Sequence, residues 1–263
     1  MNSHQSPVTS HQSRNGKVFL ISGTDTGVGK TLITAGLVAW LNSKDIRTVG
    51  MKPFTCGGND DIEMLKEASL SLCHSRAGGN LRDPRFREDD VSPLKWRLSL
   101  APYRASLLEK KPVNFIKVRS SLKKLRSQAE IVILEGVGGL LCPLTRQVTL
   151  ADWAKKEKLS VIIVARLGLG TLNHTLMTVE VAKSRGIMVK GIILNDLSPV
   201  LSSVEGPSAE DLSKRWNPRD LEELTRLPIL GIFPYLRSRT VEASKKAWEK
   251  HFDFKRIYKI IAA

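Results

Sequence analysis

The chain has 263 residues, of which 41% are hydrophobic, so it can form one large α/β domain or two small ones. No apolar run approaches the roughly 20 residues of a membrane-spanning helix, which predicts a soluble protein without a membrane partner. The net charge is +15, but the basic residues are scattered and do not alternate with aromatic residues as in nucleic-acid-binding segments. We therefore interpret them as solvated helix faces, and we expect no nucleic acid as a partner.

Two further features concern the ends of the chain and its thiols. Residues 1–17 are rich in Ser, His, Gln and Asn and lack the apolar core of a secretory signal, so we predict a disordered tail there. The three cysteines, Cys56, Cys73 and Cys142, show neither metal-ligand spacing nor a disulfide framework. This pattern favours a reducing, cytoplasmic location.

Short β-branched runs alternate with helical patterns after this tail, which is typical of βα units and a mostly parallel sheet with helices on both faces. We expect a single α/β domain over residues 18–263. The predicted strands are Val18–Ser22, Arg47–Met51, Ile131–Glu135, Val161–Ala165, Val189–Leu194 and Ile229–Phe233. The predicted helices are Thr31–Ser43, a stretch that opens near Ile62–Leu65, Pro102–Glu109, Phe115–Gln128, Thr171–Arg185, Ala209–Thr225 and Val241–Ile261.

One segment interrupts this alternation. Cys73–Val91 is dense in charge, Gly and Pro and has no usable period. We predict an inserted surface loop, which a fold tolerates because the cost of loop closure grows slowly with length.

The first strand leads into Gly23-Thr-Asp-Thr-Gly-Val-Gly-Lys-Thr31 and then into a helix, which is the context of a P-loop. Five residues separate Gly23 from Gly29, one more than in the standard motif, so this is a variant. Glycines let successive N–H groups point at phosphate oxygens, and the helix adds its positive end. Lys30 would reach the β- and γ-phosphates, and the Thr31 hydroxyl would bind Mg²⁺. The competing interpretation is a glycine-rich turn before an ordinary helix.

Carboxylates and a second lysine follow later strands. Lys52 ends the second strand, where it would either face the P-loop across the crevice or lie solvated on the surface. Asp60 and Asp61 open a helix, where they could cap it or bind Mg²⁺. Glu135 ends an apolar strand, where a carboxylate is costly unless it is paired or bound to a metal. We predict that Glu135 holds Mg²⁺, and that Gly136, Val137 and Gly138 bring backbone close to the ligand.

Three further loops are candidates for binding. Gly170, Thr171, Leu172 and Asn173 open a helix whose free N–H groups suit a carboxylate, although ordinary turn chemistry explains them as well. An amide edge for a purine could come from the pair Asn195 and Asp196. The segment Phe233, Pro234 and Tyr235 could supply an apolar rim for the same base.

Together these motifs resemble the dethiobiotin synthetases. The resemblance covers roughly Val18 to Leu236 apart from the interruption, and the tail after Leu236 matches poorly. It rests on GTDTGVGKT, MKPFTCGG, the NDD and SLAPYRAS runs, LEGVGGLLCPL with TLADWAKKEKLSVIIV, LGLGTLNHTLMT, GIILND and GIFPYL.

The resemblance implies a P-loop NTPase fold and a role for each matched position. Thr26, Lys30 and Lys52 would surround a carbamate formed on the substrate, and Thr31, Asp61 and Glu135 would hold Mg²⁺. Gly170 to Asn173 would bind the substrate carboxylate of the neighbouring subunit in a homodimer. Cys56 stands where the family usually has Ser or Thr against the substrate. The ATP site would comprise Gly27, Val28, Gly29, Lys30, Thr31, Leu32, Gly136, Val137, Gly138, Asn195, Asp196, Phe233, Pro234 and Tyr235.

The implied reaction joins 7,8-diaminononanoate, CO₂ and ATP in biotin biosynthesis. Other functions stay open at this point. A partitioning ATPase normally carries a lysine early in its P-loop, where this chain has Asp25, and an amide ligase of the cobyrinic-acid type would need an extra glutamine-hydrolysing domain. A non-catalytic nucleotide-binding regulator, or an inactive homologue, would lack some of Lys30, Lys52 and Glu135.

Overall fold

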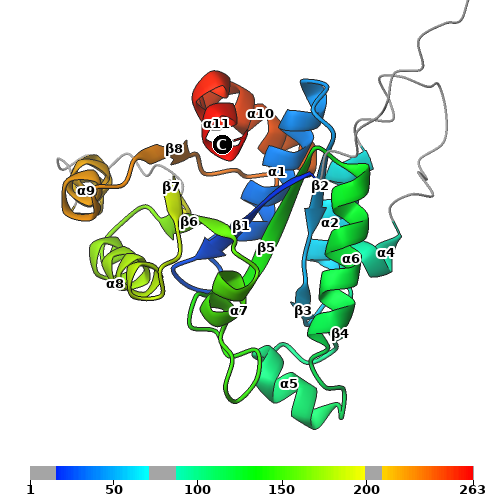
Figure 1. The fold of residues 1–263 in the computed structure, drawn as a ribbon. Coiled ribbons are helices and arrows are strands. Elements are labelled where there is room, and N and C mark those ends of the chain that lie inside the picture. Colours follow the sequence, from blue (N-terminus) through cyan, green and yellow to red (C-terminus); the bar gives the residue numbers. More distant parts are fainter. Residues whose placement is uncertain (1–15, 71–86, 199–208, 263) are drawn as a thin grey trace, which may run out of the picture.

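The computed structural model describes residues 16–70, 87–198 and 209–262. Its main sheet has six parallel strands in the order β2-β5-β1-β6-β7-β8, shown in Figure 1. All six strands were predicted from the sequence. Their bounds are β1 Lys17–Gly23, β2 Thr48–Met51, β5 Ile131–Gly139, β6 Ser160–Arg166, β7 Val189–Asn195 and β8 Ile229–Phe233.

Helices cover both faces of the sheet, and each face has its own apolar core. One core joins the sheet to α1 (Lys30–Ser43), α2 (Asp60–Leu70), α10 (Val241–His251) and α11 (Phe254–Ala262). The other joins it to α5 (Pro102–Leu108), α6 (Phe115–Gln128), α7 (Leu150–Lys156), α8 (Thr171–Ser184) and α9 (Ala209–Thr225). Within β1, Leu20 belongs to one core and its neighbours Phe19 and Ile21 to the other, as expected for a strand buried on both faces.

A second, two-stranded parallel sheet was not predicted. It pairs β3 (Phe54–Cys56) with β4 (Leu94–Trp96), and the short helix α4 (Glu88–Val91) precedes β4. Strands of three residues are too short to show a period, which explains why the sequence did not reveal them.

The end of the predicted insertion belongs to the domain. Residues 71–86 lie outside the described residues, but Val91 is fully buried and its carbonyl accepts a hydrogen bond from the Lys52 amide at 2.8 Å. The Lys124 ammonium is paired with Asp90. The predicted boundary at Val91 was therefore wrong for residues 88–91.

Both ends of the chain also differ from expectation. Most of the predicted tail lies outside the described residues, but Lys17 begins β1 rather than ending a tail. The predicted helix Val241–Ile261 is two helices, because Phe252 adopts an extended backbone and packs on Trp248 with ring centroids 4.0 Å apart. Asp253 then caps α11 by accepting a hydrogen bond from the Arg256 amide.

Candidate functional site

A cleft of about 730 Å³ opens at the carboxyl ends of the main strands, where parallel sheets bind their ligands. It has the size of a typical small-molecule site. Most of the predicted site residues line this cleft: Thr26, Gly27, Gly29, Lys30, Thr31, Leu32, Lys52, Cys56, Asp61, Glu135, Gly136, Val137, Gly138, Asn195, Asp196, Pro234 and Tyr235.

The P-loop joins β1 to α1 and needs its glycines. Gly27 and Gly29 have φ angles of 77° and 90°, which residues with a Cβ rarely adopt. A Cβ on Gly29 would also lie 2.1 Å from Nδ2 of Asn195. That amide donates a 2.9 Å hydrogen bond to the Val28 carbonyl, so Asn195 braces the loop from the end of β7.

Lys30 is the first residue of α1, and its side chain folds back over the loop. Its Nζ donates to the Asp25 carbonyl at 2.9 Å and is nearly buried. Burial lowers the pKa of Lys30, and the nearby Lys52 ammonium lowers it further, while Glu135 opposes the shift. Two cations therefore approach one region of the cleft.

Four polar side chains from separate elements converge at the end of the P-loop, and one of them, Thr31, belongs to the loop itself. The Thr31 hydroxyl lies 2.9 Å from Oδ1 of Asp61 and 2.7 Å from Oε1 of Glu135. Lys52 pairs with Asp61 and lies 3.0 Å from Oε1 of Glu135. The structure thus brings the Asp61 side chain to the centre of the site, where it does more than cap α2.

Burial disfavours the charges of this cluster, and the pairing of Lys52 with the two carboxylates stabilises them. Burial alone would lower the pKa of Lys52, but the Glu135 and Asp61 carboxylates raise it above its ordinary value, so Lys52 stays protonated. Glu135 is 1% exposed, and burial raises its pKa while Lys52 opposes this.

One atom of the cluster is suited to a cation. Among the described residues, Glu135 Oε2 is buried and has no hydrogen-bond partner, which is costly unless a ligand binds it. Carboxylate and hydroxyl oxygens are ligands that Mg²⁺ prefers, and phosphate oxygens and water usually complete its shell. The described residues contain no group of three His, Cys, Asp or Glu side chains that could hold a metal unaided.

The segments that follow β7 and β8 also reach the cleft. Asn195, Asp196, Pro234 and Tyr235 line it, and the structure adds Leu197, Leu236 and Arg239. Phe233 does not line it: the ring is fully buried and packs against Trp248 and Phe252. Its predicted contact with a base was wrong for the side chain, because the ring points into the core.

Four further residues line the cleft near Cys56, and the sequence predicted a role for none of them. Ser99, Leu100, Ala101 and Cys142 line the cleft with Cys56. Burial raises the pKa of the Cys56 thiol to about 12, and the neighbouring Cys142 adds to the effect. Both thiols are free, and burial raises the pKa of Cys142 as well, so this part of the cleft has two neutral thiols.

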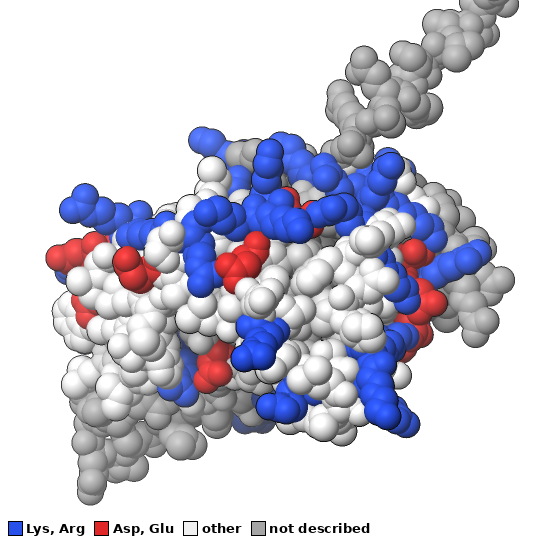
Figure 2. Space-filling model, turned by 60° about the horizontal axis from the view of Figure 1, so that its bottom comes forward, with Lys and Arg blue, Asp and Glu red and all other residues white. Residues whose placement is uncertain are grey.

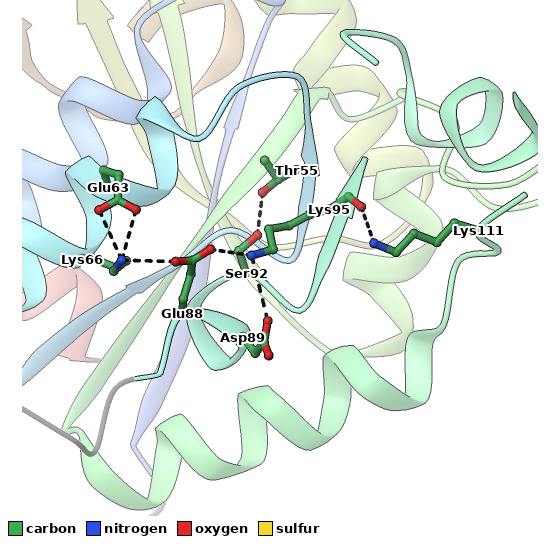
Figure 3. A network of polar contacts seen from close by, with 8 residues as sticks. All are labelled: Thr55, Glu63, Lys66, Glu88, Asp89, Ser92, Lys95 and Lys111. Atoms are coloured by element: carbon green, nitrogen blue, oxygen red, sulfur yellow. Dashed lines mark hydrogen bonds and ion pairs between the residues drawn. The ribbon is translucent and has the colours of Figure 1, made fainter. Parts of the chain in front are cut away.

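The β3–β4 sheet and α4 support Lys52, which lies between β2 and β3, and Cys56, which ends β3. Figure 3 shows Glu88 between Lys66 of α2 and Lys95 of β4, at 3.3 and 2.5 Å. The buried Thr55 and Ser92 hydroxyls are hydrogen-bonded at 2.8 Å in the same view. These contacts connect α2, which carries Asp61, to the small sheet.

The predicted carboxylate-binding residues lie elsewhere. Gly170, Thr171, Leu172 and Asn173 do not line the cleft of their own chain. Gly170 is the N-cap of α8 and has a φ angle of 85°. The Asn173 side chain is exposed, as are Leu169 and Met177, so this end of α8 is open to solvent.

The fold and the cleft define the class of protein: an α/β P-loop nucleotide-binding domain. Residues 17–243 match the family described as "AAA domain". Solved structures with the same fold include the cell division ATPase MinD of Pyrococcus furiosus and a ParA family ATPase of Chlorobium tepidum. MinD is 18% identical with a TM-score of 0.52 over 93% of this chain and 99% of its own, and the ParA protein is 15% identical with 0.52 over 89% and 92%.

The sequence is more specific. A protein named ATP-dependent dethiobiotin synthetase BioD from Bacillus velezensis is 36% identical over 89% of this chain and 94% of its own length. Its namesake from Nitrosopumilus maritimus is 31% identical over 92% of this chain and all of its own length. The chain belongs to the ATP-dependent dethiobiotin synthetase family.

Proposed function

We propose that this protein is a dethiobiotin synthase, which uses ATP, Mg²⁺ and CO₂ to close the ureido ring of dethiobiotin on 7,8-diaminononanoate. The observation that supports it most is the convergence of Thr31, Lys52, Asp61 and Glu135 opposite the P-loop lysine. A transferring phosphoryl group needs cations and a metal site in this arrangement.

The chemistry asks the protein for positioning and charge neutralisation. One substrate amine captures CO₂ as a carbamate, and a carbamate oxygen attacks the γ-phosphorus while ADP leaves. The second amine then attacks the carbamoyl carbon and phosphate leaves, which closes the ring. Thr26, Lys30 and Lys52 would surround the carbamate, where the two ammonium groups stabilise negative charge.

The triphosphate would lie on the backbone amides of Gly27 to Thr31, with Leu32 and Gly136 to Gly138 beside it. Thr31, Asp61 and Glu135 would hold Mg²⁺, which neutralises phosphate charge when it is bound. The base would lie between Asn195, Asp196, Pro234 and Tyr235. Because Asn195 already braces Val28, contact with a base would use only its remaining hydrogen-bonding capacity.

The substrate carboxylate would bind at the N-terminal end of α8 in a second copy of the chain, which makes the enzyme a homodimer. The exposed Asn173 and Met177 lie four residues apart on one helix face and suit such a contact. Val179, further along the same helix, is not available for such a contact, because it is 2% exposed and belongs to the core.

A cytoplasmic location is part of the proposal. The free thiols Cys56 and Cys142 suit a reducing compartment. Among the described residues, no helix is both long and apolar enough to cross a bilayer.

The decisive experiment supplies the purified protein with diaminononanoate, ATP, Mg²⁺ and ¹³C-bicarbonate. Mass spectrometry should find dethiobiotin one mass unit heavier than the unlabelled compound, together with equal amounts of ADP and phosphate. Lys30→Ala is the matched control, and it should form no product because the buried phosphate charge loses its cation. ATP hydrolysis without dethiobiotin, or full turnover by the control, would contradict the proposal.

A further inference from the structure

The loop before α8, residues 167–170, contains two glycines in backbone conformations that other residues rarely adopt. Gly168 and Gly170 have φ angles of 149° and 85°, in the region that favours glycine. Leu167 packs into the core, whereas Leu169 is 77% exposed and its side chain contributes little packing within the chain. Hydrogen bonds therefore contribute much of what fixes the backbone after Leu167.

Among the described residues, four hydrogen bonds hold the loop, and only one comes from a side chain. The His174 amide, within α8, donates to the Gly170 carbonyl at 3.3 Å. The Leu167 amide donates to the Asn195 carbonyl at 2.7 Å, and the Thr171 amide donates to the Gly168 carbonyl at 3.3 Å. Nδ2 of Asn217, on α9, donates to the same Gly168 carbonyl at 2.8 Å. Asn217 is only 7% exposed, and a buried amide is costly unless it is hydrogen-bonded.

The helix that carries Asn217 is itself well anchored. Lys214 pairs with Asp196 at 3.0 Å, and both side chains are mostly buried. The Ile229 amide at the start of β8 donates to the Glu222 carboxylate at 2.8 Å, and Leu221 is fully buried. Figure 1 shows α9 beside α8, at the β8 side of the sheet.

From these contacts we infer that Asn217 is a positioning residue for the substrate carboxylate, which it does not touch. It holds the Gly168 carbonyl so that the free amides of the first turn of α8 keep one direction. This inference rests on the proposed function, which places the carboxylate there. A displacement of about 1 Å in such a site can cost on the order of 10²-fold in rate. Because a charged carboxylate depends on these amides more than an uncharged group does, the Asn217 hydrogen bond acts on the preference for a carboxylate substrate.

The test compares two substrates with the wild type and three variants. The substrates are 7,8-diaminononanoate and its C1 primary amide, which lacks the negative charge. Asn217→Asp keeps the side-chain shape but removes the hydrogen-bond donor. Asn217→Ser shortens the side chain, so that it no longer reaches the Gly168 carbonyl, and adds no charge. The matched control is Glu223→Gln, which changes an exposed residue of the same helix.

We expect the wild type to prefer the carboxylate substrate in kcat/KM. In both Asn217 variants the ratio of kcat/KM for the carboxylate substrate to that for the amide should fall about tenfold. The kcat/KM for the amide and the Kd for ATP should change less than about twofold. The Glu223→Gln control should show the wild-type ratio. Equal losses on both substrates, or no folded protein from either variant, would make Asn217 a structural residue and overturn the inference. If the wild type itself shows no preference, the assigned carboxylate site fails; if the wild type and both Asn217 variants show the same preference, the role of Asn217 fails.

Discussion

Lys52 is buried beside Asp61 and Glu135, within the field of Lys30. The sequence left open whether this lysine belonged to the site or lay solvated on the surface. Parallel strands end at the same edge of a sheet, so residues that follow β1, β2 and β5 meet there despite long separations in sequence.

Lys52→Ala should lower kcat by about 10²–10³-fold, the usual cost of losing one group that stabilises developing charge. The Kd for ATP should change far less. Single-turnover kinetics and nucleotide titration separate the two effects, and a melting curve shows whether the unpaired Glu135 destabilises the fold. If ATP affinity collapsed while kcat held, Lys52 would instead bind the ground-state nucleotide.

The Cys56 thiol offers a second test at this scale. Burial raises its pKa to about 12, and only the thiolate reacts with iodoacetamide. Because a raised pKa keeps the thiol protonated, its rate of alkylation should rise about tenfold per pH unit with no plateau between pH 7 and 10. Peptide mass mapping measures the rate at Cys56, with glutathione as the unburied reference. A plateau near pH 9 would show an ordinary thiol.

At the scale of elements, most of what the sequence did not reveal is very short. β3, β4 and α4 have three or four residues, too few to show a period by themselves, whereas α1, α6, α8 and α9 are long enough to show one. The break between α10 and α11 depends on Phe252 packing against Trp248, a tertiary contact that no local pattern contains. Arg239 and Ser99 to Ala101 were missed as site residues for a related reason, since they reach the cleft from loops.

The boundary of the predicted insertion gives a test of α4. Deleting residues 74–86 should leave melting temperature and activity close to those of the parent. Extending the deletion through Val91 should destabilise the protein by about 2 kcal/mol or more, because it removes a buried apolar side chain and the carbonyl that holds the Lys52 amide. Circular dichroism and the synthase assay compare the two. A longer deletion that behaves like the shorter one would show that α4 is dispensable.

At the scale of the whole molecule, charge and apolar surface are unevenly distributed. Figure 2 shows Lys and Arg along the upper rim of the face turned forward, with a largely uncharged middle. The net charge of +15 favours the approach of anionic substrates. Residues 170–173 at the N-terminal end of α8 do not line the cleft of their own chain, and Leu169 and Met177 beside them are exposed. The proposed composite site would use this end of the helix.

The composite site can be tested by complementation. Lys52→Ala removes a cation from the cleft of its own chain, whereas Asn173→Ala alters the end of α8 that would serve the partner. In an isologous dimer each contact occurs twice, so a mixed dimer of these variants contains one site with both defects and one with neither. After dissociation and reassociation of two inactive homodimers, some activity should therefore return. Exchange is verified with distinct affinity tags. Pairs that exchange but never regain activity would show that each site lies within a single chain and that α8 does not contribute to its partner's catalysis.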